Sequence, residues 1–116
     1  SYLDYHGAKL VRRFDAGSYV SLCRTMLSYD IGRDRGGITE ALRQITARTL
    51  VISVDSDRLF FAKEGLKVAE GIPGAQYACL SSPHGHDGFL IEYDQLNRIL
   101  EDFLENQPSF IDSSAL

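Results

Sequence analysis

The sequence predicts an α/β fold, because the spacing of its apolar residues changes along the chain. Apolar runs at 49–54 and 75–81 are typical of strands, and each is followed by a segment with helical spacing, at 62–72 and 93–106. Strands that alternate with helices through short links form parallel sheets covered by helices. The region before them has only the helical period, so it is expected to be a different architectural unit.

Two amphipathic helices are expected at the start of the chain. In 1–14, apolar residues recur on one helical face, and Ser1 and Asp4 have the spacing of a capping box. In 15–30, Asp15 is placed to cap a second helix. Its apolar stripe consists of Tyr19, Leu22, Cys23, Met26 and Leu27. We expect this stripe to be a packing surface.

The elements of the α/β part follow in a fixed order. We expect a short helix at 38–45, a strand at 49–54, a helix at 62–72, a strand at 75–81 and a helix at 93–106. The first strand is a continuous run of leucine and β-branched residues, which is typical of a strand buried on both faces. The domain organisation expected is therefore a helical region at 1–37, an α/β region at 38–106 and a flexible tail at 107–116.

Composition excludes several classes of partner. The chain has 116 residues and a net charge of −4, which argues against nucleic acid or an anionic membrane as the main partner. No apolar run approaches the roughly 20 residues that a membrane-spanning helix needs. Cys23 and Cys79 are far apart in apolar settings, so we expect buried free thiols in a reducing compartment, and hence a cytoplasmic protein.

Two loops carry groups that can do acid–base chemistry. Asp55 and Asp57 follow the first strand, and His84 and His86 follow the second. Carboxyl ends of adjacent parallel strands lie at one edge of a sheet, which is where α/β proteins bind ligands. A carboxylate beside an imidazole is the orienting half of a nucleophile–base–acid triad, and acid before histidine is the α/β-hydrolase order. The spacing does not choose between the two aspartates or the two histidines, and solvated turns remain the alternative.

Three motifs resemble a known family. "VRRFDAGSYVSLCRTMLSYDIGRDRGG", "VDSDRLF" and "GHDGFLIE" together are similar to the C-terminal part of homoserine O-acetyltransferases, which have the α/β-hydrolase fold. The resemblance extends over nearly the whole chain. It implies that 1–37 is the end of the family's helical lid and that 38–106 is the C-terminal part of the α/β-hydrolase core.

The resemblance also implies roles for individual residues. It assigns the catalytic acid to Asp57, the base to His86 and contact with the amino group of homoserine to Asp87. The last assignment agrees with the chemistry, because a carboxylate forms a charge-assisted hydrogen bond with an ammonium. The chain departs from the family at Phe61, where proline is usual, and at His84, where histidine is unusual.

The implied activity is acetyl transfer from acetyl-CoA to L-homoserine in methionine biosynthesis, by a ping-pong mechanism through a serine nucleophile. The chain has no G-x-S-x-G motif, so we expect it to be a C-terminal fragment that is inactive alone. The resemblance implies no metal and no bound cofactor, and a homodimer for the complete protein. Alternatives are an acyltransferase with succinyl-CoA as donor or serine as acceptor, an esterase, or a non-catalytic truncated remnant that acts as an interaction module.

Overall fold

The computed structural model describes residues 1–106, which belong to two compact units. The first is Ser1–Ile38, and the second begins at Thr39. This division falls one residue after the boundary expected between 37 and 38. The tail expected at 107–116 lies outside the described residues.

The first unit opens with helix α1 (Tyr2–Arg13), whose start is fixed by a capping box. The Ser1 hydroxyl oxygen accepts from the backbone N–H of Asp4 at 3.3 Å, and the Asp4 carboxylate accepts from the Ser1 amino group at 3.0 Å. The hydrogen bond from the Ser1 side chain is the main cause of the lowered pKa of Asp4. The capping pair expected from the sequence is therefore confirmed.

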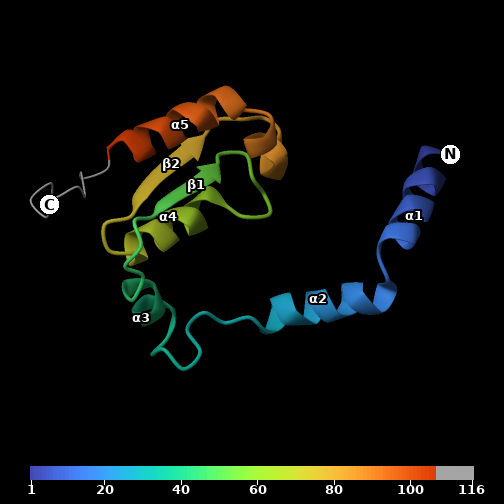
Figure 1. The fold of residues 1–116 in the computed structure, drawn as a ribbon, viewed down its shortest axis with the longest axis horizontal. Coiled ribbons are helices and arrows are strands. Elements are labelled where there is room, and N and C mark those ends of the chain that lie inside the picture. The colour runs from blue at the N-terminus through green and yellow to red at the C-terminus, as the bar shows by residue number, and fades with distance from the viewer. Residues whose placement is uncertain (107–116) are drawn as a thin grey trace, which may run out of the picture. The chain divides into compact units, whose positions relative to one another are not determined.

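Helix α2 (Ala16–Ser28) follows after a bend (Figure 1). Asp15 caps it as expected, because its carboxylate accepts from the backbone N–H of Ser18 at 2.8 Å. Within residues 1–106 the apolar stripe is packed only in part, by Tyr19, whose ring lies edge-on to that of Phe14 with centroids 6.2 Å apart. Neither helix has a buried residue there, and Leu27 is 87% exposed. The stripe has the right periodicity, but the first unit offers no third element to cover it.

Arginines in the turn after α2 satisfy nearby carbonyl groups. Arg33 donates to the carbonyl oxygen of Ser28 at 2.8 Å, and Arg35 donates to that of Ile31 at 3.1 Å. Both arginines therefore satisfy backbone carbonyl groups at the C-terminus of α2 and in the turn that follows it.

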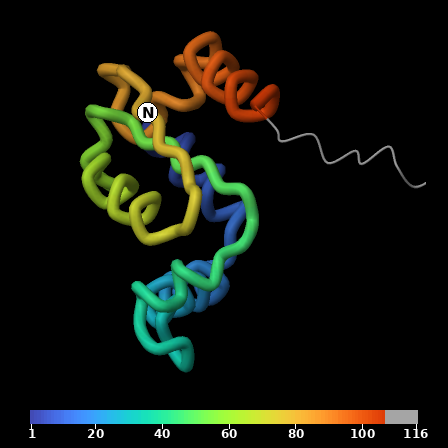
Figure 2. Tube along the Cα trace, turned by 90° about the vertical axis from the view of Figure 1, so that its left-hand side faces the viewer, coloured from blue at the N-terminus to red at the C-terminus, as the bar shows by residue number. Residues whose placement is uncertain are grey.

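The second unit is built on two parallel strands. Helix α3 (Ile38–Arg43) leads to strand β1 (Leu50–Val54), helix α4 (Ala62–Gly71), strand β2 (Gln76–Leu80), the 3₁₀ helix η1 (Gly85–Leu90) and helix α5 (Tyr93–Glu105). The strands pair from Leu50 opposite Gln76 to Val54 opposite Leu80. Helices α4 and α5 flank the strand pair on opposite sides (Figures 1 and 2). The predicted α/β class with parallel strands is confirmed.

The carboxyl ends of the strands form one buried part of this unit, and residues of α3 and α4 form another. Val54 and Leu80, the last residues of the two strands, are 6% and 0% exposed. The rest of β1 is only half-buried, so the prediction of a strand buried on both faces is wrong within residues 1–106. The described sheet has two strands, and therefore β1 has one edge with no strand beside it. The buried strand ends support the loops that follow them.

Cys23 and Cys79 are free thiols as expected, but Cys79 is exposed and Cys23 is half-buried. No helix within the described range is long and apolar enough to cross a membrane.

Candidate active site

The loops after β1 and β2 meet at one end of the strand pair. The chain turns directly after Val54, whose carbonyl oxygen accepts from the backbone N–H of Asp57 at 3.1 Å. After β2 the chain enters η1, where an irregular loop was expected, and Gly85 begins it with a φ of 63°. This left-handed conformation favours glycine. The turn and the 3₁₀ helix bring Asp57 and His86 face to face.

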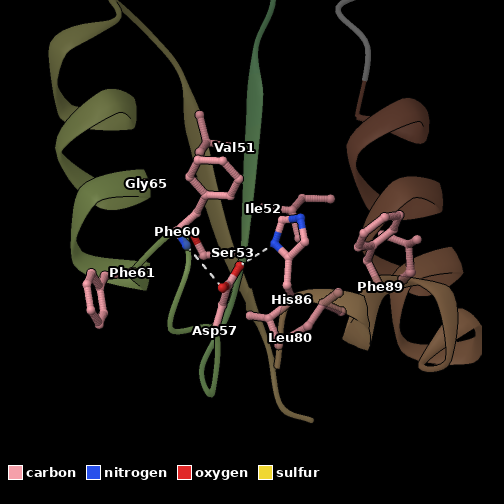
Figure 3. A pocket seen from close by; sticks show the side chains of 12 residues that line it. Val51, Ile52, Ser53, Asp57, Phe60, Phe61, Gly65, Leu80, His86 and Phe89 are labelled. Carbon is pink, nitrogen blue, oxygen red and sulfur yellow. Dashed lines mark hydrogen bonds and ion pairs between the residues drawn. The ribbon is translucent and has the colours of Figure 1, made fainter. Parts of the chain in front are cut away.

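Asp57 and His86 form a direct hydrogen-bonded pair (Figure 3). Nδ1 of His86 lies 2.9 Å from Oδ2 of Asp57. The other carboxylate oxygen, Oδ1, accepts from the backbone N–H groups of Leu59 and Phe60 at 2.7 and 3.0 Å. Asp57 is 7% exposed, whereas the His86 side chain is 45% exposed. A fixed, buried carboxylate therefore orients an accessible imidazole.

The hydrogen bond from His86 is the largest cause of a lowered pKa of Asp57. The backbone donors Phe60 and Leu59 lower this pKa further, and desolvation opposes them. Asp57 is therefore ionised at neutral pH and can only accept hydrogen bonds. Nδ1 of His86 must then carry the proton, which leaves Nε2 as the nitrogen that can accept one.

Two aromatic rings lie beside the imidazole. The centroids of the Phe60 and Phe89 rings lie 5.2 and 6.3 Å from that of His86. The pair lines a hollow of about 420 Å³. Its other lining residues are mostly apolar: Val51, Ile52, Ser53, Val54, Phe60, Phe61, Gly65, Leu80, Phe89 and Leu96. Apolar walls strengthen electrostatic interactions at the pair. Phe60 and Phe89 were not predicted as site residues, although Phe60 follows Asp57 and Phe89 follows His86 by three positions.

The remaining candidates have other positions. Asp55 accepts from the backbone N–H of Ser82 at 3.0 Å and from the Ser81 hydroxyl at 2.9 Å. These bonds, that of Ser82 first, lower the pKa of Asp55. The His84 side chain is exposed and makes no hydrogen bond within residues 1–106. Asp87 is exposed in the first turn of η1 and does not line the hollow.

This arrangement can act as an acid–base pair but does not contain a nucleophile. Among the described residues no hydroxyl or thiol forms a hydrogen bond with Nε2 of His86. The same residues contain no group of three or more side chains that could hold a metal ion. The pair can accept a proton from a group brought to Nε2 and return it to a leaving group.

Comparison with known proteins identifies close relatives. The chain is 50% identical over 105 residues to the homoserine O-acetyltransferase of Thermobifida fusca, a match that covers 90% of this chain and 28% of the relative. It is 47% identical over 106 residues to the enzyme of the same name from Salinibacter ruber, and 41% identical over 118 residues to that of Emericella nidulans. No family model matches the chain.

These matches confirm the resemblance based on the three motifs. They cover 90 to 96% of this chain. The chain spans only about a quarter to a third of the length of these curated relatives, between 24 and 30%.

Proposed function

We propose that the chain is part of a homoserine O-acetyltransferase, to which it contributes the catalytic acid Asp57 and the base His86. The observation that carries the proposal is the 2.9 Å contact between the ionised Asp57 carboxylate and Nδ1 of His86. The relatives are named homoserine O-acetyltransferases. We take acetyl-CoA as the acetyl donor and L-homoserine as the acceptor from the family resemblance.

In the first half-reaction, Nε2 of His86 takes the proton of a serine hydroxyl. The serine oxygen attacks the thioester carbonyl of acetyl-CoA, and the carbon–sulfur bond breaks. The imidazolium then gives its proton to the CoA thiolate. Free CoA departs, and the serine remains acetylated. Asp57 remains ionised throughout and stabilises the imidazolium.

In the second half-reaction, the hydroxyl of homoserine replaces the thiol. Nε2 of His86 takes its proton, and its oxygen attacks the acetyl-serine carbonyl. The serine leaves with the proton that His86 returns. The exposed carboxylate of Asp87, one residue after the base, is proposed to bind the substrate ammonium.

We propose that the nucleophilic serine lies in another part of the enzyme, one that corresponds to the region of the relatives outside the match. We also propose, on the resemblance alone, a cytoplasmic homodimer in methionine biosynthesis that uses no metal and no bound cofactor. Within that protein, Ser1–Ile38 is proposed to belong to a helical lid and the second unit to the α/β-hydrolase core.

A hybrid enzyme tests this function. In it, the present chain replaces the matched segment of the Thermobifida fusca relative, which is 50% identical over 105 residues. We expect the hybrid to release CoA from acetyl-CoA and to form O-acetylhomoserine. Succinyl-CoA and L-serine, offered in turn, test the choice of donor and acceptor. A correctly folded hybrid that only hydrolyses acetyl-CoA, or that does nothing with it, would contradict the proposal.

A further inference from the structure

We propose that Asp55 and Ser56 are positioning residues, which hold the loop that carries His86 in register with Asp57. Three consecutive side chains after β1 bind the second loop at successive points: Asp55 at Ser81 and Ser82, Ser56 at Ser82 and Gly85, and Asp57 at His86. The inference rests on the proposed function, because it assigns these bonds a role in the same acid–base pair.

Asp55 fixes the start of the second loop. Its Oδ1 accepts from the backbone N–H of Ser82 at 3.0 Å, and its Oδ2 accepts from the Ser81 hydroxyl at 2.9 Å. Ser81 is held independently, because its backbone N–H donates to Oε1 of Gln95 at 2.8 Å and its carbonyl oxygen accepts from Nε2 of Gln95 at 3.2 Å. Ser82 has no such second support on its N–H within residues 1–106. The Asp55 carboxylate is therefore the acceptor that holds the N–H of Ser82.

Ser56 fixes the loop immediately before the base. Its hydroxyl donates to the carbonyl oxygen of Ser82 and accepts from the backbone N–H of Gly85 at 3.0 Å. Gly85 is in a left-handed conformation and precedes His86 directly. The direction in which the chain leaves Gly85 sets the position of the His86 backbone, so the Ser56 hydroxyl acts one residue from the base.

The single bond to Asp57 does not fix His86 by itself. The His86 side chain is 45% exposed, and its one hydrogen bond within residues 1–106 is the one to Asp57. Ser82, by contrast, is 4% exposed and has its N–H and carbonyl groups bound by Asp55 and Ser56. A buried anchor four residues before the base can hold an exposed imidazole in place, and catalysis depends on such placement.

The two aspartates should respond differently to an isosteric change. In Asp55→Asn, the amide oxygen can still accept from Ser82 N–H, and the amide nitrogen can donate to the Ser81 hydroxyl oxygen. Geometry is then preserved without the charge. In Asp57→Asn the charge that stabilises the imidazolium is lost. A positioning residue is therefore rescued by asparagine, whereas the catalytic acid is not.

The test uses the hybrid enzyme with Asp55→Ala, Ser56→Ala and Asp55→Asn, and measures the burst of CoA release at the first turnover. We expect each alanine variant to slow the burst by about tenfold to 10²-fold, as for a displacement of the base of the order of 1 Å. Asp55→Asn should stay within about threefold of the parent. An Asn variant as slow as the Ala variant, or an Ala variant as fast as the parent, would overturn the proposal.

A second readout separates positioning from general loss of stability. The Nδ1–H proton of His86, observed by NMR with ¹⁵N-labelled histidine, reports the bond to Asp57 directly. It should weaken or vanish in Asp55→Ala and Ser56→Ala and persist in Asp55→Asn. Ala69→Gly, at a buried site on α4, supplies a destabilised control that should keep both the signal and the burst. Loss of both in Ala69→Gly would also contradict the inference.

The same signal separates failure of the inference from failure of the proposed function. If the parent hybrid is folded but transfers no acetyl group, the function fails. The effect of the Asp55 and Ser56 variants on the Nδ1–H signal still decides whether these residues position His86.

Discussion

Gly88 packs directly against Val54, so the 3₁₀ helix that carries His86 rests on the last residue of β1. A Cβ atom at Gly88 would lie 2.9 Å from Cγ1 of Val54 and 2.9 Å from Cβ of Ser82. Gly88 is buried, and both of its neighbours are among the most buried residues of the unit. This close contact fixes the distance between η1, which carries His86, and the carboxyl end of β1.

Gly88→Ala should therefore displace the 3₁₀ helix and lower stability. An overpacked methyl group costs about 1–3 kcal/mol, and neither neighbour can move without disturbing the core. We expect a lower unfolding temperature in the hybrid enzyme together with slower CoA release. Gly7→Ala on α1 is the matched control, because a Cβ there meets nothing within 4 Å. Equal behaviour of the two variants would show that the contact is not tight.

The lowered pKa of Asp57 predicts a specific dependence of stability on pH. A carboxyl whose pKa in the folded state is below its usual value of 3.8 stabilises the fold above that value. This stabilisation is lost as the pH falls below 3.8 and through the lowered pKa of the folded state. The hybrid with Asp57→Asn should lose less stability than the parent over that acidic range, measured by urea unfolding at each pH. An unchanged acidic loss of stability in Asp57→Asn would contradict the lowered pKa.

Asp57→Asn should also reduce turnover far more than Asp55→Asn. Loss of the orienting carboxylate costs about 10⁴-fold in the best-studied triad. Asp55 is bound to Ser81 and Ser82 rather than to His86, and its amide isostere can keep those bonds. Steady-state kcat in the hybrid enzyme measures the difference. Equal losses would mean that the loop as a whole, rather than one carboxylate, sets the activity.

Asp87→Ala should separate the two half-reactions. The exposed Asp87 side chain does not line the hollow beside His86, so acetyl-serine formation does not require it. Burst release of CoA should stay within about threefold of the parent, whereas the KM for homoserine should rise by about tenfold or more, since a charged hydrogen bond contributes about 1.5–3 kcal/mol. A lost burst, or an unchanged KM for homoserine, would exclude this role.

Much of the second unit could be predicted from the sequence because its elements carry strong local signals. The β-branched run at β1 and the apolar stripe of α5 each correspond to an observed element, and the strand order then required parallel pairing. The capping residues Ser1 and Asp15 could also be predicted, since each accepts a hydrogen bond from a backbone N–H only three residues later.

Contacts between distant residues could not be predicted in the same way. Spacing did not distinguish Asp57 from Asp55, because the choice depends on which side chain points toward a loop 29 residues away in the sequence. The 3₁₀ helix of η1 has no periodic apolar pattern, and the roles of Ser56 and Gly88 arise only when the two loops meet. The resemblance to a family supplied the assignment of Asp57 and His86 that the pattern left open.

The burst of CoA release in the hybrid enzyme, compared between His86→Ala and His84→Ala, tests the central claim most directly. His86 is bound to Asp57 and has Nε2 available, whereas the exposed His84 side chain makes no hydrogen bond within the described residues. We predict that His86→Ala abolishes the burst and that His84→Ala retains it. A burst that survives in His86→Ala, or that disappears in His84→Ala, would contradict the assignment of the base.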